Sequence, residues 1–341
     1  MDLPRTNVLG VGVSAIDMQQ VVDLLLDARA HGRTGYVCVT GVHGVIESQR
    51  DPELKRIHNH SLMTVPDGMP TVWMGREQGF TKMGRVYGPD LMLEVCRQTS
   101  ALKPSLGTGH QELGRNSEER KALDDEYGQH LGGSNAQCPA PSAQRPFTHF
   151  LYGSTPETLS KLKSNLEARF PGVQIVGTYA PPFRPLNEEE EKELAAVVSA
   201  CKPDFFWVGL STPKQERFMA AHCPQGCVHH ELQRTEVRGQ TSDIKGPRLD
   251  QNSSDLRPPI SDHCKFPLDA GIMLGVGAAF DIHAGLLKDA PEWVKNSGLQ
   301  WLHRLCQEPR RLWRRYLDIV PKFIGLAFLQ VMGIRKYSLD D

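Results

Sequence analysis

The fold is decided by the stretch Tyr36-Val37-Cys38-Val39-Thr40-Gly41. Its first five residues are β-branched or aromatic apart from one cysteine, which predicts a buried strand. Gly41 ends that strand, and residues 42–48 have the pattern of a helix start. A strand that passes directly into a helix is typical of a parallel sheet with crossover connections.

The same alternation continues on both sides of this stretch. Ser14 and Asp17 are both candidate N-caps for the first expected helix. We expect further strands over residues 7–13, 63–65, 148–152, 173–178, 204–209 and 271–276. We expect helices over residues 16–30, 157–170, 187–200 and 213–221, and a turn with a short helix over 277–287. The sequence therefore predicts an α/β fold built on a parallel sheet.

Two stretches interrupt the alternation, at about residues 103–146 and 222–266. Both are rich in polar residues and proline and have few large apolar residues, which predicts irregular insertions. The chain then becomes helical in pattern, with aromatic and basic residues interleaved. We therefore divide it into a core of residues 1–290, which carries both insertions, and a basic amphipathic C-terminal appendage of residues 291–341.

Composition limits the class of protein. The chain has 341 residues, of which 39% are apolar and 23% charged, so it buries a core and is not wholly disordered. No apolar run reaches the ~20 residues that span a bilayer, which excludes a polytopic membrane protein. A net charge of −1 gives no overall attraction to nucleic acid. Eight cysteines are too sparse for a disulfide scaffold, and residues 1–5 do not resemble a secretory signal, so we expect a reduced, cytosolic protein.

An acid follows one of the predicted strands. Asp67 lies in the run Pro66-Asp67-Gly68, directly after the expected strand at residues 63–65. Ligands bind at the carboxyl ends of parallel strands, so Asp67 is a candidate general base. Asp-Gly is also typical of a turn, so a structural role as turn residue or N-cap stays open. Arg85, beside a glycine turn, is either a phosphate ligand or a surface arginine.

Two glycine-containing turns follow later strands. Residues 209–216 join a strand to a helix, whose free N–H groups favour an anion. The alternative is simple capping of that helix by Ser211 or Thr212. Residues 275–281 nearly match the dinucleotide fingerprint, but Phe280 occupies the place of its third glycine, so the match is weak.

Basic residues gather among aromatic and leucine residues near the C-terminus. At 100° per residue, four arginines fall on about one side of a helix: Arg304, Arg311, Arg314 and Arg315. A basic helix that carries tryptophan predicts contact with a membrane surface or a polyphosphate, and the alternative is the solvated face of a packing helix. The apolar residues 319–334 are interrupted by Pro321 and Lys322 and are too few to span a bilayer.

Cysteine and histidine residues concentrate in the second insertion. They provide enough ligands for a zinc ion, but their spacing is not that of a compact zinc finger, so incidental residues are the favoured interpretation. The residues concerned are Cys223, Cys227, His229, His230, His263 and Cys264. The core contains no convincing Asp-x-Asp metal motif, and the pair Asp124-Asp125 falls in the first insertion.

Taken together and in order, the motifs of this chain resemble those of the WecG/TagA/CpsF glycosyltransferases. The resemblance covers nearly all of the chain outside the two insertions. The matching stretches are residues 40–44, 51–54, 66–70, 85–91, 150–153, 213–216, 275–281, 301–305 and 308–312.

The resemblance implies a Rossmann-like α/β core with a C-terminal helical appendage. It implies inverting transfer of a sugar, typically N-acetylmannosamine or its uronic acid, from a UDP-sugar to a sugar linked through diphosphate to a polyprenol. This reaction builds cell-surface polymers. The resemblance also implies a cytoplasmic protein that associates peripherally with the inner face of the cell membrane through its appendage. Docking of the tail on a neighbouring copy would be consistent with a homo-oligomer, and no nucleic-acid partner is expected.

The motifs also carry site residues onto this chain. Asp67 matches the family's general base. The residues that match its substrate pocket and its diphosphate-binding arginines are Thr40, His43, Arg85, Gln215, Arg304, Arg311 and Arg314. An inverting transfer needs a base for the acceptor hydroxyl and positive charge on the departing UDP. Arginines can supply that charge, so we expect neither a metal nor a cofactor.

One position departs from the family pattern. Many relatives carry an asparagine where this chain has Gly41, which removes a hydrogen-bonding side chain from the pocket. Gly41 and the two insertions leave open a degenerate relative that binds UDP-sugar or membrane without turnover. The insertions are either selected structure or artefacts such as retained non-coding segments. A nucleotide-dependent oxidoreductase, motivated only by Gly275 and Gly277, is the weaker alternative.

Overall fold

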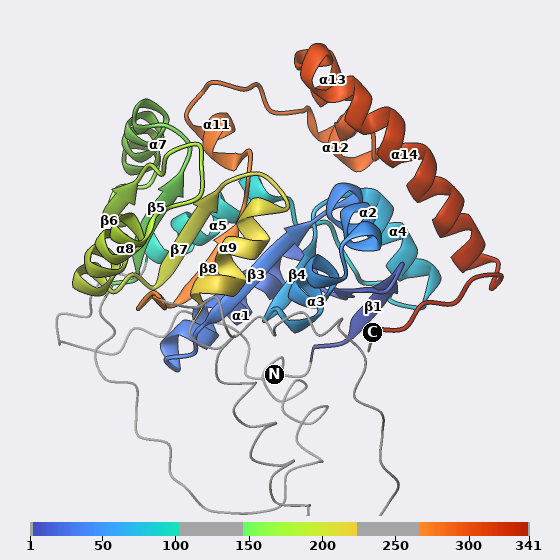
Figure 1. Cartoon of the computed structure of the whole chain (residues 1–341), viewed down its shortest axis with the longest axis horizontal. Coiled ribbons are helices and arrows are strands. Elements are labelled where there is room, and N and C mark those ends of the chain that lie inside the picture. The colour runs from blue at the N-terminus through green and yellow to red at the C-terminus, as the bar shows by residue number, and fades with distance from the viewer. Residues whose placement is uncertain (1–2, 102–145, 224–265, 340–341) are drawn as a thin grey trace, which may run out of the picture. The chain divides into compact units, whose positions relative to one another are not determined.

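The computed structural model describes residues 3–101, 146–223 and 266–339 (Figure 1). The two insertions expected at about residues 103–146 and 222–266 lie almost wholly outside these ranges. The described parts of residues 1–101 and 147–341 form one compact unit, and a parallel sheet is its central element.

Six strands of the described residues make up this sheet. In chain order they are β3 (Gly35–Thr40), β4 (Met63–Pro66), β5 (Thr148–Gly153), β6 (Gln174–Tyr179), β7 (Phe205–Gly209) and β8 (Ile272–Gly275). Their order across the sheet is β4-β3-β8-β7-β5-β6, and every neighbouring pair is parallel. The α/β fold with a parallel sheet is thus confirmed, and each of these strands was expected from the sequence.

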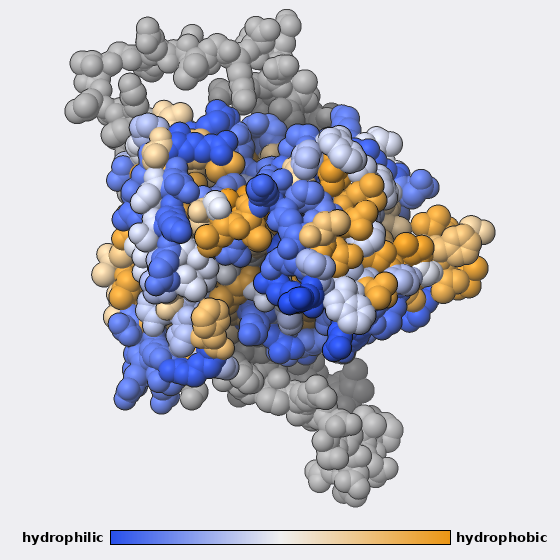
Figure 2. Space-filling model, turned by 90° about the horizontal axis from the view of Figure 1, so that it is seen from above, coloured by the Kyte–Doolittle hydropathy of each residue, from blue (hydrophilic) through white to orange (hydrophobic). Residues whose placement is uncertain are grey.

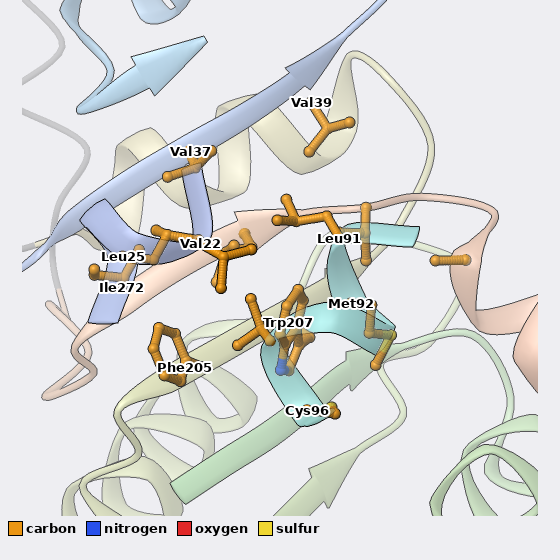
Figure 3. Packing of buried hydrophobic residues seen from close by; sticks show 14 of the residues in the cluster. Val22, Leu25, Val37, Val39, Leu91, Met92, Cys96, Phe205, Trp207 and Ile272 are labelled. Carbon is orange, nitrogen blue, oxygen red and sulfur yellow. The ribbon is translucent and has the colours of Figure 1, made fainter. Parts of the chain in front are cut away.

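Helices cover both faces of the sheet. On one face lie α1 (Met18–Ala30), α5 (Gly88–Ala101), α7 (Pro156–Arg169) and α11 (Ala279–His283). On the other lie α3 (Pro52–His60), α8 (Glu188–Cys201) and α9 (Lys214–His222). Phe205 and Trp207 of β7 belong to the first core and Phe206 and Val208 to the second, because successive strand residues point to opposite faces. Figure 3 shows Phe205 and Trp207 packed among residues of α1, α5 and β3.

The first helix shows how local sequence sets these elements. Its N-cap is Asp17, whose carboxylate accepts from the backbone N–H of Gln20 at 2.9 Å, while the Gln20 side chain bonds back to the N–H of Asp17. This reciprocal pair is a capping box, and it identifies Asp17 and not Ser14 as the N-cap of α1. Val21, Val22, Leu25 and Ala28 then follow at helical spacing and are buried.

The single strand expected over residues 7–13 is wrong. Two short strands, β1 (Arg5–Val8) and β2 (Val11–Ser14), form an antiparallel hairpin outside the main sheet. Leu9 and Gly10 join them with φ of 54° and 82°. Two positive φ values are what a two-residue hairpin turn needs, and Gly10 adopts one at no steric cost. The glycine that looked like part of a strand therefore reverses the chain.

The C-terminal region contains α12 (Glu292–Asn296), α13 (Gln300–Gln307) and α14 (Pro309–Val331). Sequence periodicity treated the arginines of this region as one helical face, but the helix breaks at Glu308 between α13 and α14. By contrast, α14 continues through Pro321. The boundary proposed at residue 290 between core and appendage stays a prediction.

One side of α14 packs against α2 (Val42–Arg50), α4 (Met69–Glu77) and the hairpin, as Figure 1 shows. Ile319, Phe323 and Ala327 are buried in this contact. At the far end of α14 the Gln330 side chain accepts from Leu9 N at 2.9 Å and donates to Asn7 O at 2.7 Å. Within the described ranges, no helix is both long and apolar enough to cross a membrane.

Candidate functional site

A cleft of about 860 Å³ opens at the carboxyl ends of four neighbouring strands, β4, β3, β8 and β7. The segments that follow these strands and line the cleft are residues 67–70, 41–44, 276–278 and 209–212. Residues of α4, α13 and α14 form much of the rest of its lining, and α5, α9, α11 and α12 add single residues. Ligands of open parallel sheets bind at this edge, so the cleft is the candidate functional site.

Asp67 lines this cleft directly after β4. Its N–H donates to Thr40 O at 3.1 Å, and its Oδ1 accepts from Gly88 N at 3.2 Å. The N-cap of α4 is Gly68, which leaves Asp67 without the capping role that the sequence left open. Burial raises the pKa of Asp67 to about 6, although the Gly88 N–H and the positive charges of Arg85 and Arg304 oppose that shift. A carboxyl group that titrates near neutrality in a cleft is suited to general base catalysis.

Gly41 lies beside this carboxylate. A Cβ atom added at Gly41 would lie 3.6 Å from Asp67 Oδ2, within ordinary van der Waals contact. Any side chain at position 41 would therefore touch the candidate base. Glycine leaves this side of the carboxylate open, whereas the hydrogen bond from Gly88 N, which positions the other oxygen, does not depend on residue 41.

Three residues predicted from the sequence carry buried polar atoms that find no hydrogen-bond partner among the described residues. These atoms are Thr40 Oγ1, Arg85 Nη1 and Gln215 Oε1. Buried polar atoms are rarely left unpaired, because each one loses its water without compensation. Gln215 lines the cleft, whereas Thr40 and Arg85 lie behind its lining residues. A polar group of a bound ligand would satisfy the Gln215 oxygen, which supports a polar subsite beside Gln215 in the cleft.

The side-chain amide of Gln215 has a fixed orientation. Its Nε2 donates to Glu216 Oε1 at 3.0 Å and to Gly275 O at 3.3 Å. Glu216 is fully buried, and its Oε1 also accepts from Thr212 Oγ1 at 2.9 Å. With both N–H groups of the amide engaged, Gln215 Oε1 remains as a free acceptor. Thr212 thus binds Glu216, and neither it nor Ser211 caps α9.

Local packing explains the two glycines, Gly275 and Gly277, of the stretch that nearly matches the dinucleotide fingerprint. A Cβ at Gly275 would lie 2.7 Å from Met219 Cε, so glycine lets α9 pack on β8. Gly277 has a φ of 52°, and a Cβ there would lie 3.3 Å from Leu210 O and 3.5 Å from Gln215 Oε1. Helix packing and a tight turn account for both glycines without a dinucleotide.

Arg85 belongs to a network of charged and aromatic residues at the wall of the cleft, in which Tyr87 and Lys295 are lining residues. Its Nη2 lies 3.6 Å from carboxylate oxygens of Asp90 and Glu292, and its guanidinium lies 5.2 Å from the centre of the Tyr87 ring. Lys295 lies 5.1 Å from the same ring centre and pairs with Glu292 at 2.9 Å. Through Asp90 and Glu292 the two cations link α5 to α12. Arg85 is also close enough to lower the pKa of Asp67.

Arginines of the C-terminal helices line the cleft opposite the strand ends. Arg304, Arg311 and Arg315 are lining residues. The Glu308 carboxylate pairs with Arg311 at 2.8 Å and lies 3.6 Å from Arg304, so it holds the two together across the break between α13 and α14. Arg314, which the resemblance assigned to the diphosphates, is exposed outside the lining.

Two further lining residues, His43 and Asp281, have titratable side chains whose pKa values are shifted. His43 lies at the start of α2, and burial together with the nearby Arg315 and Arg50 lowers its pKa to about 4, so it is neutral at pH 7. Asp281 of α11 was missed by the sequence analysis, although it ends the 275–281 motif. Burial raises the pKa of Asp281, and the positive charges of Arg304 and Arg311 lower it in part.

Most of the cysteine and histidine residues considered for zinc lie outside the described residues. Cys223 is buried at the end of α9, whereas the other five lie outside the described ranges, as does the pair Asp124-Asp125. Among the residues that the structure does describe, no three His, Cys, Asp or Glu side chains come together as metal ligands would.

Comparison with known proteins agrees with the geometry. The model of the Glycosyl transferase WecG/TagA/CpsF family matches residues 6–118, 135–230 and 260–337, which include Asp67, Gln215 and the cleft arginines. Over 175 residues the chain is 25% identical to the N-acetylglucosaminyldiphosphoundecaprenol N-acetyl-beta-D-mannosaminyltransferase of Bacillus spizizenii, which covers 51% of this chain and 49% of that protein. The chain thus spans about half the length of this relative. Because the family match extends over most of its length, the chain belongs to the WecG/TagA/CpsF family of glycosyl transferases.

Proposed function

We propose that the protein is an inverting glycosyltransferase of cell-surface polysaccharide synthesis. It would move an N-acetylmannosamine-type sugar from a UDP-sugar to a sugar linked through diphosphate to a polyprenol. The carrying observation is the Asp67 carboxyl group, with a pKa of about 6, in a cleft whose other wall presents three arginines. The Bacillus relative supports the choice of sugar and acceptor, since its name describes mannosaminyl transfer to a diphosphoundecaprenol-linked sugar.

Asp67 is the general base of this mechanism. It accepts the proton of the acceptor hydroxyl while that oxygen forms a bond to the anomeric carbon of the donor. The bond from this carbon to the UDP oxygen breaks on the opposite side, which inverts the configuration. The hydrogen bond from Gly88 N to Oδ1 orients the carboxylate, and the opening beside Gly41 leaves Oδ2 accessible for the proton.

Positive charge stabilises the departing diphosphate. Negative charge develops on UDP as its bond to the sugar breaks, and preorganised donors that meet this charge lower the barrier. Arg304, Arg311 and Arg315 line the cleft and present planar guanidinium groups that suit the phosphate oxygens both of the departing UDP and of the acceptor's diphosphate. Neutral His43 and the free acceptor of Gln215 add uncharged hydrogen-bonding groups to the same cleft.

The outer side of the C-terminal helices supports action at a membrane surface. Figure 2 shows apolar side chains gathered at the right of the view, the side on which α14 lies in Figure 1. Exposed apolar residues of α13 and α14 that do not line the cleft are Leu302, Trp313, Leu317 and Phe328. With exposed arginines beside them, such helices bind anionic bilayers in the interfacial plane. Co-sedimentation with anionic vesicles tests this, and substitution of Leu317 by glutamate should weaken it.

The decisive experiment measures UDP release. Each of several UDP-N-acetylhexosamines is incubated with a short-chain polyprenyl-diphosphate N-acetylglucosamine acceptor, with and without EDTA. Acceptor-dependent release that survives EDTA supports the transferase and the arginine-based mechanism, and it names the donor. If folded protein binds UDP but releases none from any donor, the degenerate binder replaces this proposal.

A further inference from the structure

The cleft does not end at the arginines. It continues between α4 and α14 as a groove lined mainly by apolar side chains, which we call the α4–α14 groove. Its lining residues are Met69, Trp73, Met74, Val320, Phe323, Ile324, Ala327 and Val331. Glu77, the last residue of α4, is the charged residue among the lining positions of α4.

The lining of α14 changes character along the helix. Arg311 and Arg315 are followed at intervals of four residues by Ile319, Phe323, Ala327 and Val331, and all six line the cleft. Residues four apart are neighbours on a helix surface, so this row of lining residues begins with two cations and continues with hydrocarbon as it winds along the helix. At 1.5 Å per residue, the apolar part from residue 319 to 331 is about 18 Å long.

We propose that the α4–α14 groove binds the first isoprene units of the acceptor's polyprenyl chain. The acceptor of the proposed function is a sugar, a diphosphate and a hydrocarbon chain in that order. The cleft offers Asp67, then the arginines, then the apolar groove, so charge and polarity match the acceptor along its length. The inference rests on the proposed function, because it names where the lipid part of that substrate lies.

This groove borders the outer apolar side of α14. Leu317 and Phe328 are exposed and are not among the lining residues, whereas Val320 and Ile324 line the groove. At 100° per residue Ile324 lies about 20° from Leu317 around the helix axis, so the apolar face of α14 is continuous from the edge of the groove to the outer side. A chain held in the groove leaves the bilayer near its diphosphate, which draws the acceptor sugar toward Asp67.

Acceptors of graded chain length test the groove without vesicles. The probes are N-acetylglucosamine diphosphates that carry a methyl group or one to five isoprene units, each used below its micelle concentration. The groove predicts that KM for the acceptor falls about threefold or more with each added unit until the groove is filled, and then levels off. A KM that is independent of chain length, while transfer proceeds, would overturn the groove and leave the transferase intact.

Variants on α14 sharpen the test. Ile324 is 62% exposed and so tolerates a polar replacement, and Ile324→Gln should flatten the dependence on chain length. Leu286→Gln is the matched control, because Leu286 is an exposed aliphatic residue outside the cleft, and it should keep the wild-type dependence. Phe328→Gln should weaken vesicle binding but keep the dependence. Equal dependence in the Ile324 and Leu286 variants would contradict the groove, whereas absence of transfer with every acceptor would contradict the proposed function itself.

Discussion

The strand side and the helix side of the cleft hold their polar groups in different ways. On the strand side, backbone and buried side chains fix Asp67 and Gln215, through Gly88 N, Gly275 O and Glu216. On the helix side, Arg311 is 64% exposed, and its ion pair is with Glu308 of its own region. One side is built into the core, and the other is a set of charges on the surface of two helices.

This difference separates chemistry from substrate anchoring. Groups fixed by buried hydrogen bonds keep their geometry and have shifted pKa values, which a general base requires. Exposed arginines are screened by salt and pair loosely, but they can follow a flexible diphosphate. We therefore expect substitution of Asp67 on the strand side to lower kcat with little change in KM, and substitutions on the helix side to raise KM as well as lower kcat, with greater salt sensitivity.

The largest effect is expected for Asp67→Asn. Asparagine keeps an oxygen for the bond from Gly88 N, but it is unable to take a proton, so kcat should fall by about 10³. The thermal midpoint should stay close to that of the wild type, which differential scanning fluorimetry checks. Turnover within tenfold of the wild type would remove Asp67 from the role of base.

The arginines of the helix side come next. The double variant Arg304→Gln, Arg311→Gln should raise the KM of the lipid-linked acceptor by about 30-fold, because charge-assisted bonds to the diphosphate are lost. Steady-state kinetics at low and high salt measure this, and the wild type should approach the variant as salt increases.

Single variants distinguish Arg314, which the resemblance assigns to the diphosphates, from Arg315, which lines the cleft in the structure. Arg315→Gln should raise KM several-fold and Arg314→Gln less, since Arg315 lines the cleft and Arg314 does not. The reverse order would mean that the diphosphate is bound as the resemblance implied, through Arg314.

A smaller effect is expected at Glu216. Glu216→Leu removes the acceptor that orients the Gln215 amide, so the donor KM should rise by about tenfold with a smaller change in kcat. Glu216→Gln keeps a carbonyl oxygen that accepts from both Gln215 and Thr212, and it should restore the donor KM. Equal defects in two variants of equal thermal stability would argue against this positioning role.

The smallest effect is a displacement of the pH profile. A base must be deprotonated to act, so kcat/KM should rise with pH through an apparent pKa of about 6. The positive charge of Arg304 lowers the pKa of Asp67, so Arg304→Gln should move the rise toward higher pH. Arg314→Gln should leave it in place, and a shift of the Arg304 variant toward lower pH would contradict the assignment.

Much of the core followed from local sequence. Residues 36–40 form a buried strand because β-branched and aromatic side chains suit both faces of a covered sheet. Strand ends of a parallel sheet share one edge, so Asp67 after β4 and the turn after β7 could be placed at a common cleft. The hairpin at residues 5–14 was missed, because the glycines inside this apolar run give no sign of whether the chain extends or reverses.

The cleft arginines mark the limit of sequence periodicity. Periodicity puts Arg304, Arg311, Arg314 and Arg315 on about one side of an unbroken helix, and the resemblance singles out the first three. In the structure the helix breaks at Glu308, and Arg315 lines the cleft whereas Arg314 does not. Asp281 was overlooked because residues 275–281 were compared with the glycine pattern of a dinucleotide site, in which attention falls on the glycines and not on the final aspartate.

The sequence by itself determined the α/β fold, the parallel strands and the position of Asp67 at a strand end, because periodicity and turn chemistry act over a few residues. Only the tertiary structure decided which arginines face the cleft, that Gln215 presents its oxygen, and that an apolar groove continues from the arginines. These features depend on the approach of segments far apart in the chain. Burial then sets the pKa of Asp67, since desolvation is a property of the whole packed site and of no single stretch of residues.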